Sequence, residues 1–113
     1  MDRAESELIL RSRAGDTWAF ERLTSRYDRR LLALALDLVG DPADAQDVVQ
    51  EALIRAYRAL PGFRMDSDFF TWLYRIAVNQ GRRLRAGRRR RQERLAAAAD
   101  QPGPRPAAAP DAG

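Results

Sequence analysis

Eight arginines lie within the thirteen positions from Arg82 to Arg94, and their side chains are suited to binding phosphate groups. The planar guanidinium group can donate hydrogen bonds to two phosphate oxygens at once. Positive charge this dense repels itself on an isolated helix and becomes favourable beside a polyanion. A membrane surface is the competing partner, but the segment has no apolar face beyond Leu84 to anchor it there. The run therefore favours a polyanion as the partner.

Four aromatic residues occupy six positions shortly before this run, from Phe69 to Tyr74. One helix cannot bury all of them along a single stripe, so we expect Phe69 to face the core. Trp72 and Tyr74 either complete the core or stack on unpaired bases. Asn79 adds an amide to the same stretch. Aromatic, amide and basic residues together indicate nucleic-acid binding more strongly than the arginines alone.

A second cluster of polar side chains falls on one side of a predicted helix at Asp44, Asp47, Gln50 and Glu51, because residues three and four apart share a helix face. One interpretation is a solvated face on which Glu51 pairs with Arg55. A magnesium site is disfavoured, since three acids along one helix seldom form an octahedral set. The functional interpretation is a docking surface for a basic partner.

Residue types that most enzymes need are missing from the 113-residue chain, which has no cysteine, no histidine and no lysine. Thiolate catalysis, histidine general bases and Schiff bases are therefore excluded. We expect no catalytic residue, no metal site and no cofactor. The longest strictly apolar run, Leu31 to Leu36, is too short to span a bilayer. The N-terminus shows no signal-type pattern, so we expect a cytoplasmic protein without membrane insertion.

Apolar spacing and helix-stop residues predict an all-α bundle of about four helices. Phe20, Leu23, Tyr27 and Leu31 are spaced as one apolar stripe, which predicts a long helix after the N-cap Asp16. Asp41-Pro42 is typical of a helix start, and Pro61-Gly62 of a helix end. The expected helices cover about residues 3–14, 17–39, 42–59 and 68–92.

Composition changes abruptly at the C-terminal end of the chain. Fourteen of the last 18 residues are Ala, Pro or Gly, and they include four of the six prolines. Such a segment has little apolar surface to bury, although Ala96–Ala99 allow one more helical turn. We therefore expect a helical domain over residues 1–95 and a disordered linker or tail over 96–113.

These segments resemble a known family. The stretches DAQDVVQEALIRAYRAL (44–60), GFR (62–64) and DFFTWLYRIAVN (68–79) are similar to region 2 of bacterial sigma factors, and most similar to the extracytoplasmic-function (ECF) group. GDTWAFERL (15–23) also resembles a motif of that group. The resemblance spans about residues 4–91, with the motifs in the family's order and spacing.

The resemblance implies a non-enzymatic sigma factor domain with two partners. Asp47, Gln50 and Glu51 would dock on the coiled coil of the β′ subunit of core RNA polymerase. The following loop and helix would capture the non-template strand of the promoter's minus-ten element during melting, with Phe63 and Asn79 at a pocket for a flipped-out base. The remaining expected DNA-binding residues are Trp72 beside the bases and Arg75, Arg82, Arg83 and Arg85 on phosphates.

The sequence departs from the family pattern at Met65, where glycine is common, and at Phe70, where a polar residue is frequent. The preferred minus-ten sequence is therefore not implied. The usual second domain, which reads the minus-thirty-five element, is absent, and we expect an isolated region 2, as a truncated chain or a natural short form. An anti-sigma factor is a further expected partner. The alternatives are a non-specific arginine-rich binder of single strands and a module that binds only an anti-sigma protein.

Overall fold

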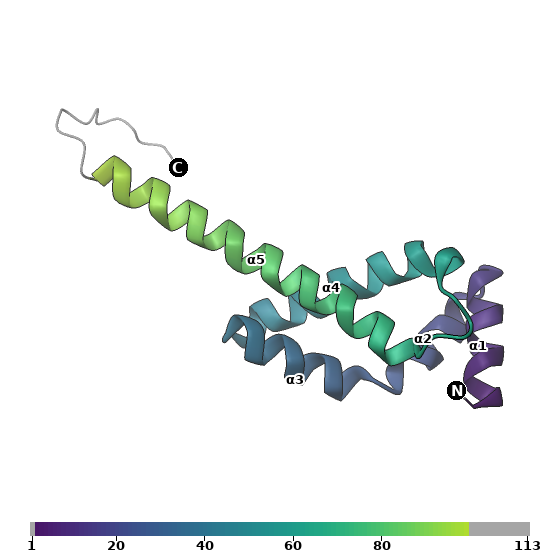
Figure 1. Ribbon diagram of the computed structural model, residues 1–113. Helices are drawn as coiled ribbons and strands as arrows, with labels where there is room; N and C mark the ends of the chain where they lie inside the picture. The colour runs from purple at the N-terminus through teal and green to yellow at the C-terminus, as the bar shows by residue number, and fades with distance from the viewer. Residues whose placement is uncertain (1, 100–113) are drawn as a thin grey trace.

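The computed structural model describes residues 2–99, and in this range the chain is all-α, with five α-helices and no strand. The three longest helices lie side by side, and the two N-terminal helices lie at the end where the last helix begins (Figure 1). This confirms the predicted class. The elements are α1 (Arg3–Arg13), α2 (Thr17–Ser25), α3 (Asp28–Val39), α4 (Pro42–Ala59), the short 3-10 helix η1 (Leu60–Gly62) and α5 (Phe69–Ala99).

Aspartates cap the N-termini of four of these helices. The Asp16 carboxylate accepts a hydrogen bond from the backbone N–H of Ala19 at 3.0 Å, as the sequence predicted for the start of α2. Asp41 caps α4 in the same way, and Asp2 and Asp68 cap α1 and α5. The Thr71 N–H holds the pKa of the Asp68 carboxyl below its ordinary value.

The prediction of one continuous helix over 17–39 is wrong, because the chain breaks into α2 and α3 at Arg26–Tyr27. Near the end of α2, the Thr24 and Ser25 hydroxyls donate hydrogen bonds to carbonyl groups one turn earlier. Such hydroxyls compete with the helical backbone pattern. Tyr27 then adopts a non-helical conformation with φ −119° and ψ 5°. The apolar stripe continues across the break and hides it from a periodicity argument.

The core lies where α3, α4 and α5 meet, with Ile9 of α1 and Leu23 of α2 closing it. On α4 the fully buried residues are alanines and one valine, so α3 and α5 approach this helix closely. The apolar spacing of α4 also predicts Leu53 and Tyr57 in the core, but they are only half-buried and face the α2 side of α4. The core face of α4 is therefore rotated from the one that the large apolar residues predicted.

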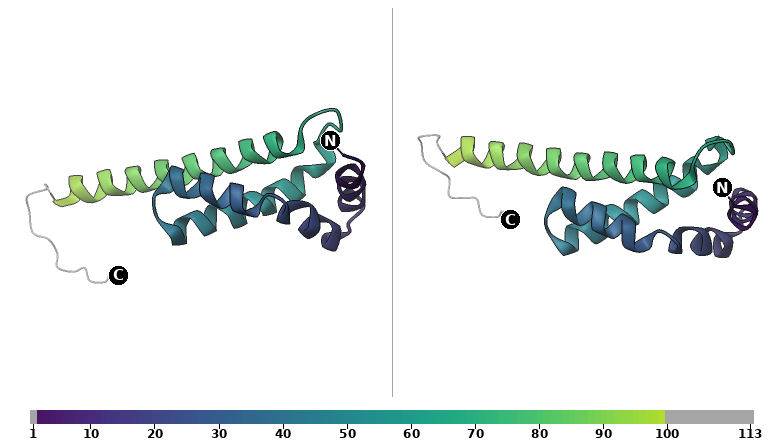
Figure 2. Two further views of the ribbon diagram at one scale, coloured as in Figure 1. Left: turned by 90° about the horizontal axis from the view of Figure 1, so that it is seen from below. Right: turned by 60° about the horizontal axis from the view of Figure 1, so that its bottom comes forward.

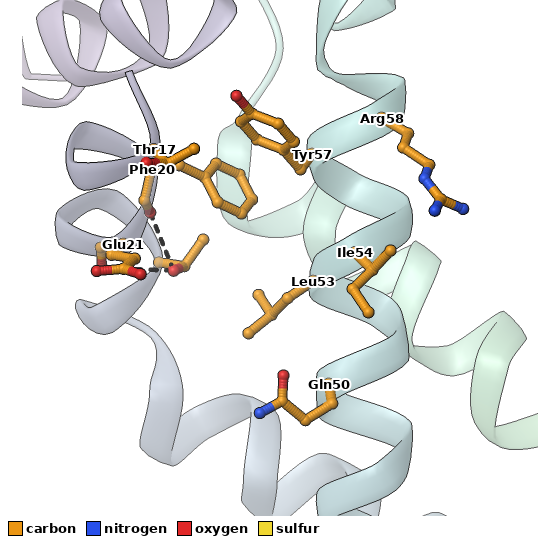
Figure 3. Close-up of a pocket in the computed structure, with 9 residues that line it drawn as sticks. Thr17, Phe20, Glu21, Gln50, Leu53, Ile54, Tyr57 and Arg58 are labelled. Carbon is orange, nitrogen blue, oxygen red and sulfur yellow. Dashed lines mark hydrogen bonds between the residues drawn. The ribbon is translucent and has the colours of Figure 1, made fainter. Parts of the chain in front are cut away.

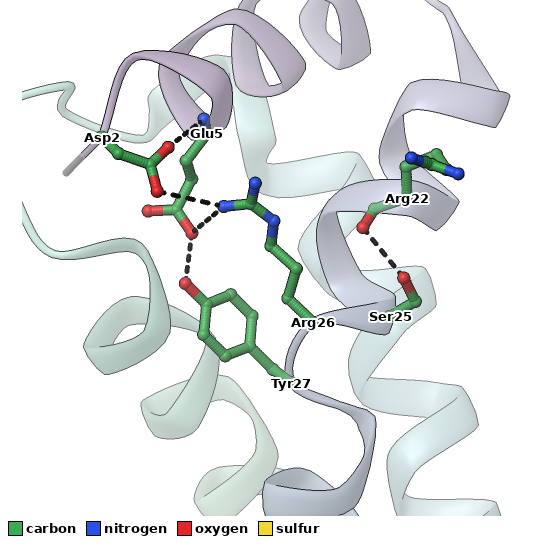
Figure 4. A network of polar contacts seen from close by, with 6 residues as sticks. All are labelled: Asp2, Glu5, Arg22, Ser25, Arg26 and Tyr27. Carbon is green, nitrogen blue, oxygen red and sulfur yellow. Dashed lines mark hydrogen bonds and ion pairs between the residues drawn. The ribbon is translucent and has the colours of Figure 1, made fainter.

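A polar network ties α1 to the α2–α3 break, as Figure 4 shows. Glu5 is buried, accepts a hydrogen bond from the Tyr27 hydroxyl, and lies 3.8 Å from the Arg26 guanidinium. The Tyr27 ring packs against Phe69 and Phe70 of α5, with centroids 6.1 and 5.0 Å apart. Burial, with help from Glu5, raises the pKa of Tyr27 to about 12. The break is thus held in place from both sides.

Helix α5 crosses the body and then continues beyond it (Figure 2). The crossing with α3 is close at Gly81, where a Cβ atom would lie 2.8 Å from Leu38 Cδ1. Residues 88–99 are all exposed. The helix includes Ala96–Ala99, so it passes the expected domain boundary by four residues. The remainder of the predicted tail, 100–113, lies outside the described residues.

Candidate nucleic-acid interface

The outer side of α5 carries the polar residues that the sequence singled out. Phe69, Leu73 and Ala77 are fully buried against the body. The opposite side of the same helix therefore faces solvent, and Arg75, Asn79 and Arg82 are all exposed there. Arg83 and Arg85 are exposed on the two flanks of this strip. The helix thus presents one amide among four guanidinium groups.

Beside this strip, α4 and α5 enclose a hollow of about 160 Å³. Asn79 lines it. The carboxamide of its neighbour Gln80 also lines it, and the Gln80 Oε1 atom is buried with no hydrogen-bond partner among the described residues. An unsatisfied buried acceptor of this kind costs free energy. The complete lining is Arg55, Ala59, Ile76, Asn79, Gln80 and Arg83.

Sequence reasoning missed four residues of this lining, namely Arg55, Ala59, Ile76 and Gln80. Their one-turn spacing within each helix was visible, since Arg55 and Ala59 are four apart, as are Ile76 and Gln80. That spacing does not reveal which face of α4 meets which face of α5. The hollow therefore becomes visible only in the folded chain.

Phe63 does not line this hollow. Its side chain is 3% exposed and packs edge-on against Phe69 and Trp72, with centroids 5.6 and 5.1 Å apart. The Arg13 side chain donates hydrogen bonds to the carbonyl groups of Phe63 and, at 3.2 Å, of Leu60. In this conformation Phe63 anchors the loop before α5 and offers no free ring face. Trp72 is half-buried beside it.

One arginine of the run, Arg88, already forms an ion pair within the protein. Arg88 forms two contacts with the Asp44 carboxylate, at 2.5 and 2.6 Å. Asp44 is buried at the start of α4, so it does not belong to the exposed cluster in which the sequence placed it. The other seven arginines of the run are also exposed.

The other expected docking residues do share an exposed face of α4. Asp47 and Gln50 are exposed, and Glu51 is half-buried beside Arg55, whose Nε atom lies 3.4 Å from a Glu51 carboxylate oxygen. Ile54, 45% exposed, follows one turn after Gln50. The face thus surrounds one apolar side chain with polar groups, as many protein-binding surfaces do.

An apolar groove of about 450 Å³ runs beside this face, between α2 and α4 (Figure 3). Phe20 and Tyr57 meet in it edge-on, with centroids 5.0 Å apart. Gln50 and Leu53 also line a second hollow of about 310 Å³ toward α3, so the groove continues past them. The docking face therefore borders on open apolar surface.

The described residues contain no group of three or more acidic, histidine or cysteine side chains placed to hold a metal ion. No helix in residues 2–99 is both long enough and apolar enough to cross a membrane. What the fold does present is a basic face on α5 and a polar face on α4.

These faces belong to a helical domain of the class found in transcription initiation factors, which are not enzymes. Residues 23–93 match the family described as Sigma-70 region 2, and the chain belongs to that family. Its relatives include ECF sigma factors. It is 48% identical to the ECF RNA polymerase sigma-E factor of Escherichia coli over 84 residues, 74% of this chain and 44% of that protein.

Two further comparisons agree with this membership. The chain is 47% identical to the RNA polymerase sigma-H factor of Pseudomonas aeruginosa over 87 residues, 77% of this chain and 45% of that protein. The chain thus spans slightly less than half of these relatives. It also matches a solved structure of an engineered region 2 of sigmaE in complex with GTAAAA, at 41% identity and a TM-score of 0.73, covering 80% of this chain and 97% of that one.

Proposed function

We propose that this chain joins core RNA polymerase to the melted minus-ten element of promoter DNA during transcription initiation. The observation that carries the proposal is the hollow between α4 and α5, lined by Asn79 and flanked by Arg83. An unstacked base exposes its hydrogen-bonding edge, and an amide can match only some edges. The adjacent guanidinium groups supply the phosphate contacts that hold the strand.

In this proposal the non-template strand lies along the outer side of α5. Asn79 binds one flipped-out base, and Gln80 offers a second carboxamide to the same base. Arg75, Arg82, Arg83 and Arg85 bind phosphates. Phe63 acts by holding the loop before α5 in place, and Trp72 supports it. The related sigmaE region 2, solved with GTAAAA, supports a DNA strand of this length as ligand.

The polymerase-binding half of the proposal rests on α4. Asp47, Gln50 and Glu51 lie on one face of α4, and the residues proposed to bind DNA lie on α5, so the two partners would use different helices. Their acids suit a basic partner surface, for which we propose the coiled coil of the β′ subunit. A chain with these partners acts in the cytoplasm, where transcription takes place.

An anti-sigma factor is the second candidate partner. The apolar groove between α2 and α4 favours it, because this groove borders the docking face and remains open to solvent. A protein seated there would cover Gln50 and compete with polymerase. Competition between such a protein and core polymerase for this chain is the expected result.

The DNA-binding half is tested by fluorescence anisotropy with labelled single-stranded DNA. We expect the full chain to bind an oligonucleotide containing GTAAAA more tightly than one with the same bases in scrambled order. Equal affinity for both would instead identify a non-specific arginine-rich binder. No binding to either would exclude the DNA-binding half altogether.

A further inference from the structure

Arg55 lies between the two surfaces described above. It belongs to α4, one turn after the docking residue Glu51, and its side chain is 45% exposed. It also lines the hollow that contains Asn79 and, on the α5 side, Arg83. Arg55 is therefore the one ionised side chain that α4 contributes to the hollow.

The charge of Arg55 is partly neutralised by Glu51. Their closest nitrogen and oxygen atoms are 3.4 Å apart, and the Glu51 side chain is 40% exposed. An exposed pair four residues apart on a helix is weak and can be exchanged for other partners. No acidic residue lines the hollow itself. The only carboxylate paired with Arg55 in the described structure is thus a residue that also belongs to the docking face.

We propose that Arg55 is a DNA-binding residue, which holds the phosphate of the nucleotide whose base enters the hollow. Glu51 competes with that phosphate in the free chain. When a basic partner surface takes up Glu51, the Arg55 guanidinium is released to the DNA. The inference rests on the proposed function and adds a coupling between its two halves, so that each partner strengthens the binding of the other.

The test measures the affinity of the full chain for single-stranded GTAAAA DNA without polymerase, at several salt concentrations. Arg55→Ala should weaken binding about tenfold, since one charge-assisted contact is lost. The slope of log affinity against log salt should fall by about 0.7 for the lost phosphate contact. Glu51→Gln should tighten binding about twofold, because the competing carboxylate is removed.

Arg58→Ala is the matched control. Arg58 is also an exposed arginine of α4, but it lines the groove toward α2 instead of the hollow. Its loss removes the same charge and should change affinity less than twofold. Arg55→Met retains the aliphatic part of the side chain and should match Arg55→Ala, so lost packing is separated from lost charge. Circular dichroism checks that each variant is folded.

The double variant Glu51→Gln with Arg55→Ala decides the coupling. It should bind like Arg55→Ala alone, because Glu51 acts through Arg55. If Arg55→Ala weakens DNA binding no more than Arg58→Ala does, the proposed contact between Arg55 and DNA is wrong. If Glu51→Gln still tightens DNA binding in the absence of Arg55, the proposed competition between Glu51 and the phosphate is wrong. Failure of the unaltered chain to bind GTAAAA would instead count against the proposed function.

Discussion

Asp44 and Arg88 form an ion pair with two short nitrogen–oxygen contacts although 44 residues separate them in the chain. Asp44 lies in the first turn of α4, and Arg88 lies in the basic part of α5. The Asp44 side chain is 10% exposed and that of Arg88 is 58% exposed. The pair thus fixes the first turn of α4 to α5 where α5 begins to leave the body.

Replacing Arg88 should destabilise the fold more than replacing Asp44. Arg88→Ala leaves a buried carboxylate without its partner, and we expect a loss of about 1–3 kcal/mol in the free energy of unfolding. Asp44→Ala leaves an arginine that water can solvate, so its cost should be about 1 kcal/mol. Urea denaturation followed by circular dichroism measures both. Arg89→Ala, an exposed neighbour, should change stability by less than about 0.5 kcal/mol. A loss from Arg88→Ala equal to this control would show that the pair is not stabilising.

Tyr27 should make the fold sensitive to alkaline pH. Its pKa is about 12 in the folded chain, against an ordinary value of 10.0. The folded state therefore keeps a proton that the unfolded state releases, and stability should fall as pH rises from about 10 to about 12. Below pH 10 this group contributes no pH dependence. Melting temperature against pH should show the decline in the unaltered chain and lack it in Tyr27→Phe. The same decline in both would assign it to other groups.

Charge reversal on α4 should separate docking from folding. Asp47→Arg combined with Glu51→Arg should abolish binding to core polymerase, because both side chains lie on the docking face and would now repel a basic partner. Helix content by circular dichroism should be unchanged. Asp37→Arg, an exposed change on α3, is the control and should bind normally. Unchanged polymerase affinity in the double variant would place the docking surface elsewhere.

Substitutions of Asn79 and of Arg82 should affect DNA binding in different ways. Asn79→Ala should cost about 1–3 kcal/mol in DNA affinity and relax preference at a single minus-ten position, since only an amide distinguishes base edges. Arg82→Ala should weaken all sequences about equally and lower the salt slope by about 0.7. Oligonucleotides varied at every position, at two salt concentrations, separate the two patterns. A uniform loss for Asn79→Ala with a lower melting temperature would assign this residue a structural role.

Local signals predicted the helices well. Asp16 and Asp41-Pro42 mark the starts of α2 and α4 in the sequence, and the aspartate caps form as expected. The break at Arg26–Tyr27 escaped prediction because the apolar stripe continues across it and because the contacts that hold Tyr27 there come from α1 and α5, which are distant in sequence. Sequence periodicity carries no information about such contacts.

The site was predictable to the extent that its residues lie on one helix. The exposed strip of α5 follows from helical spacing alone. Asp44 and Phe63 behaved differently, since a distant arginine buries the first and aromatic neighbours enclose the second. The contribution of Arg55 to the hollow required the packing of α4 on α5. The individual helices could be predicted from the sequence, but the way in which they pack against one another could not.

The proposed bridging of polymerase and melted promoter DNA by one chain can be measured in a single titration. A labelled fork-junction promoter oligonucleotide is titrated with bacterial core RNA polymerase, with and without this chain, and fluorescence anisotropy is followed. We expect the chain to tighten capture of the fork by polymerase, and Asp47→Arg with Glu51→Arg to remove this effect. Identical titrations with and without the chain would contradict the proposed bridging.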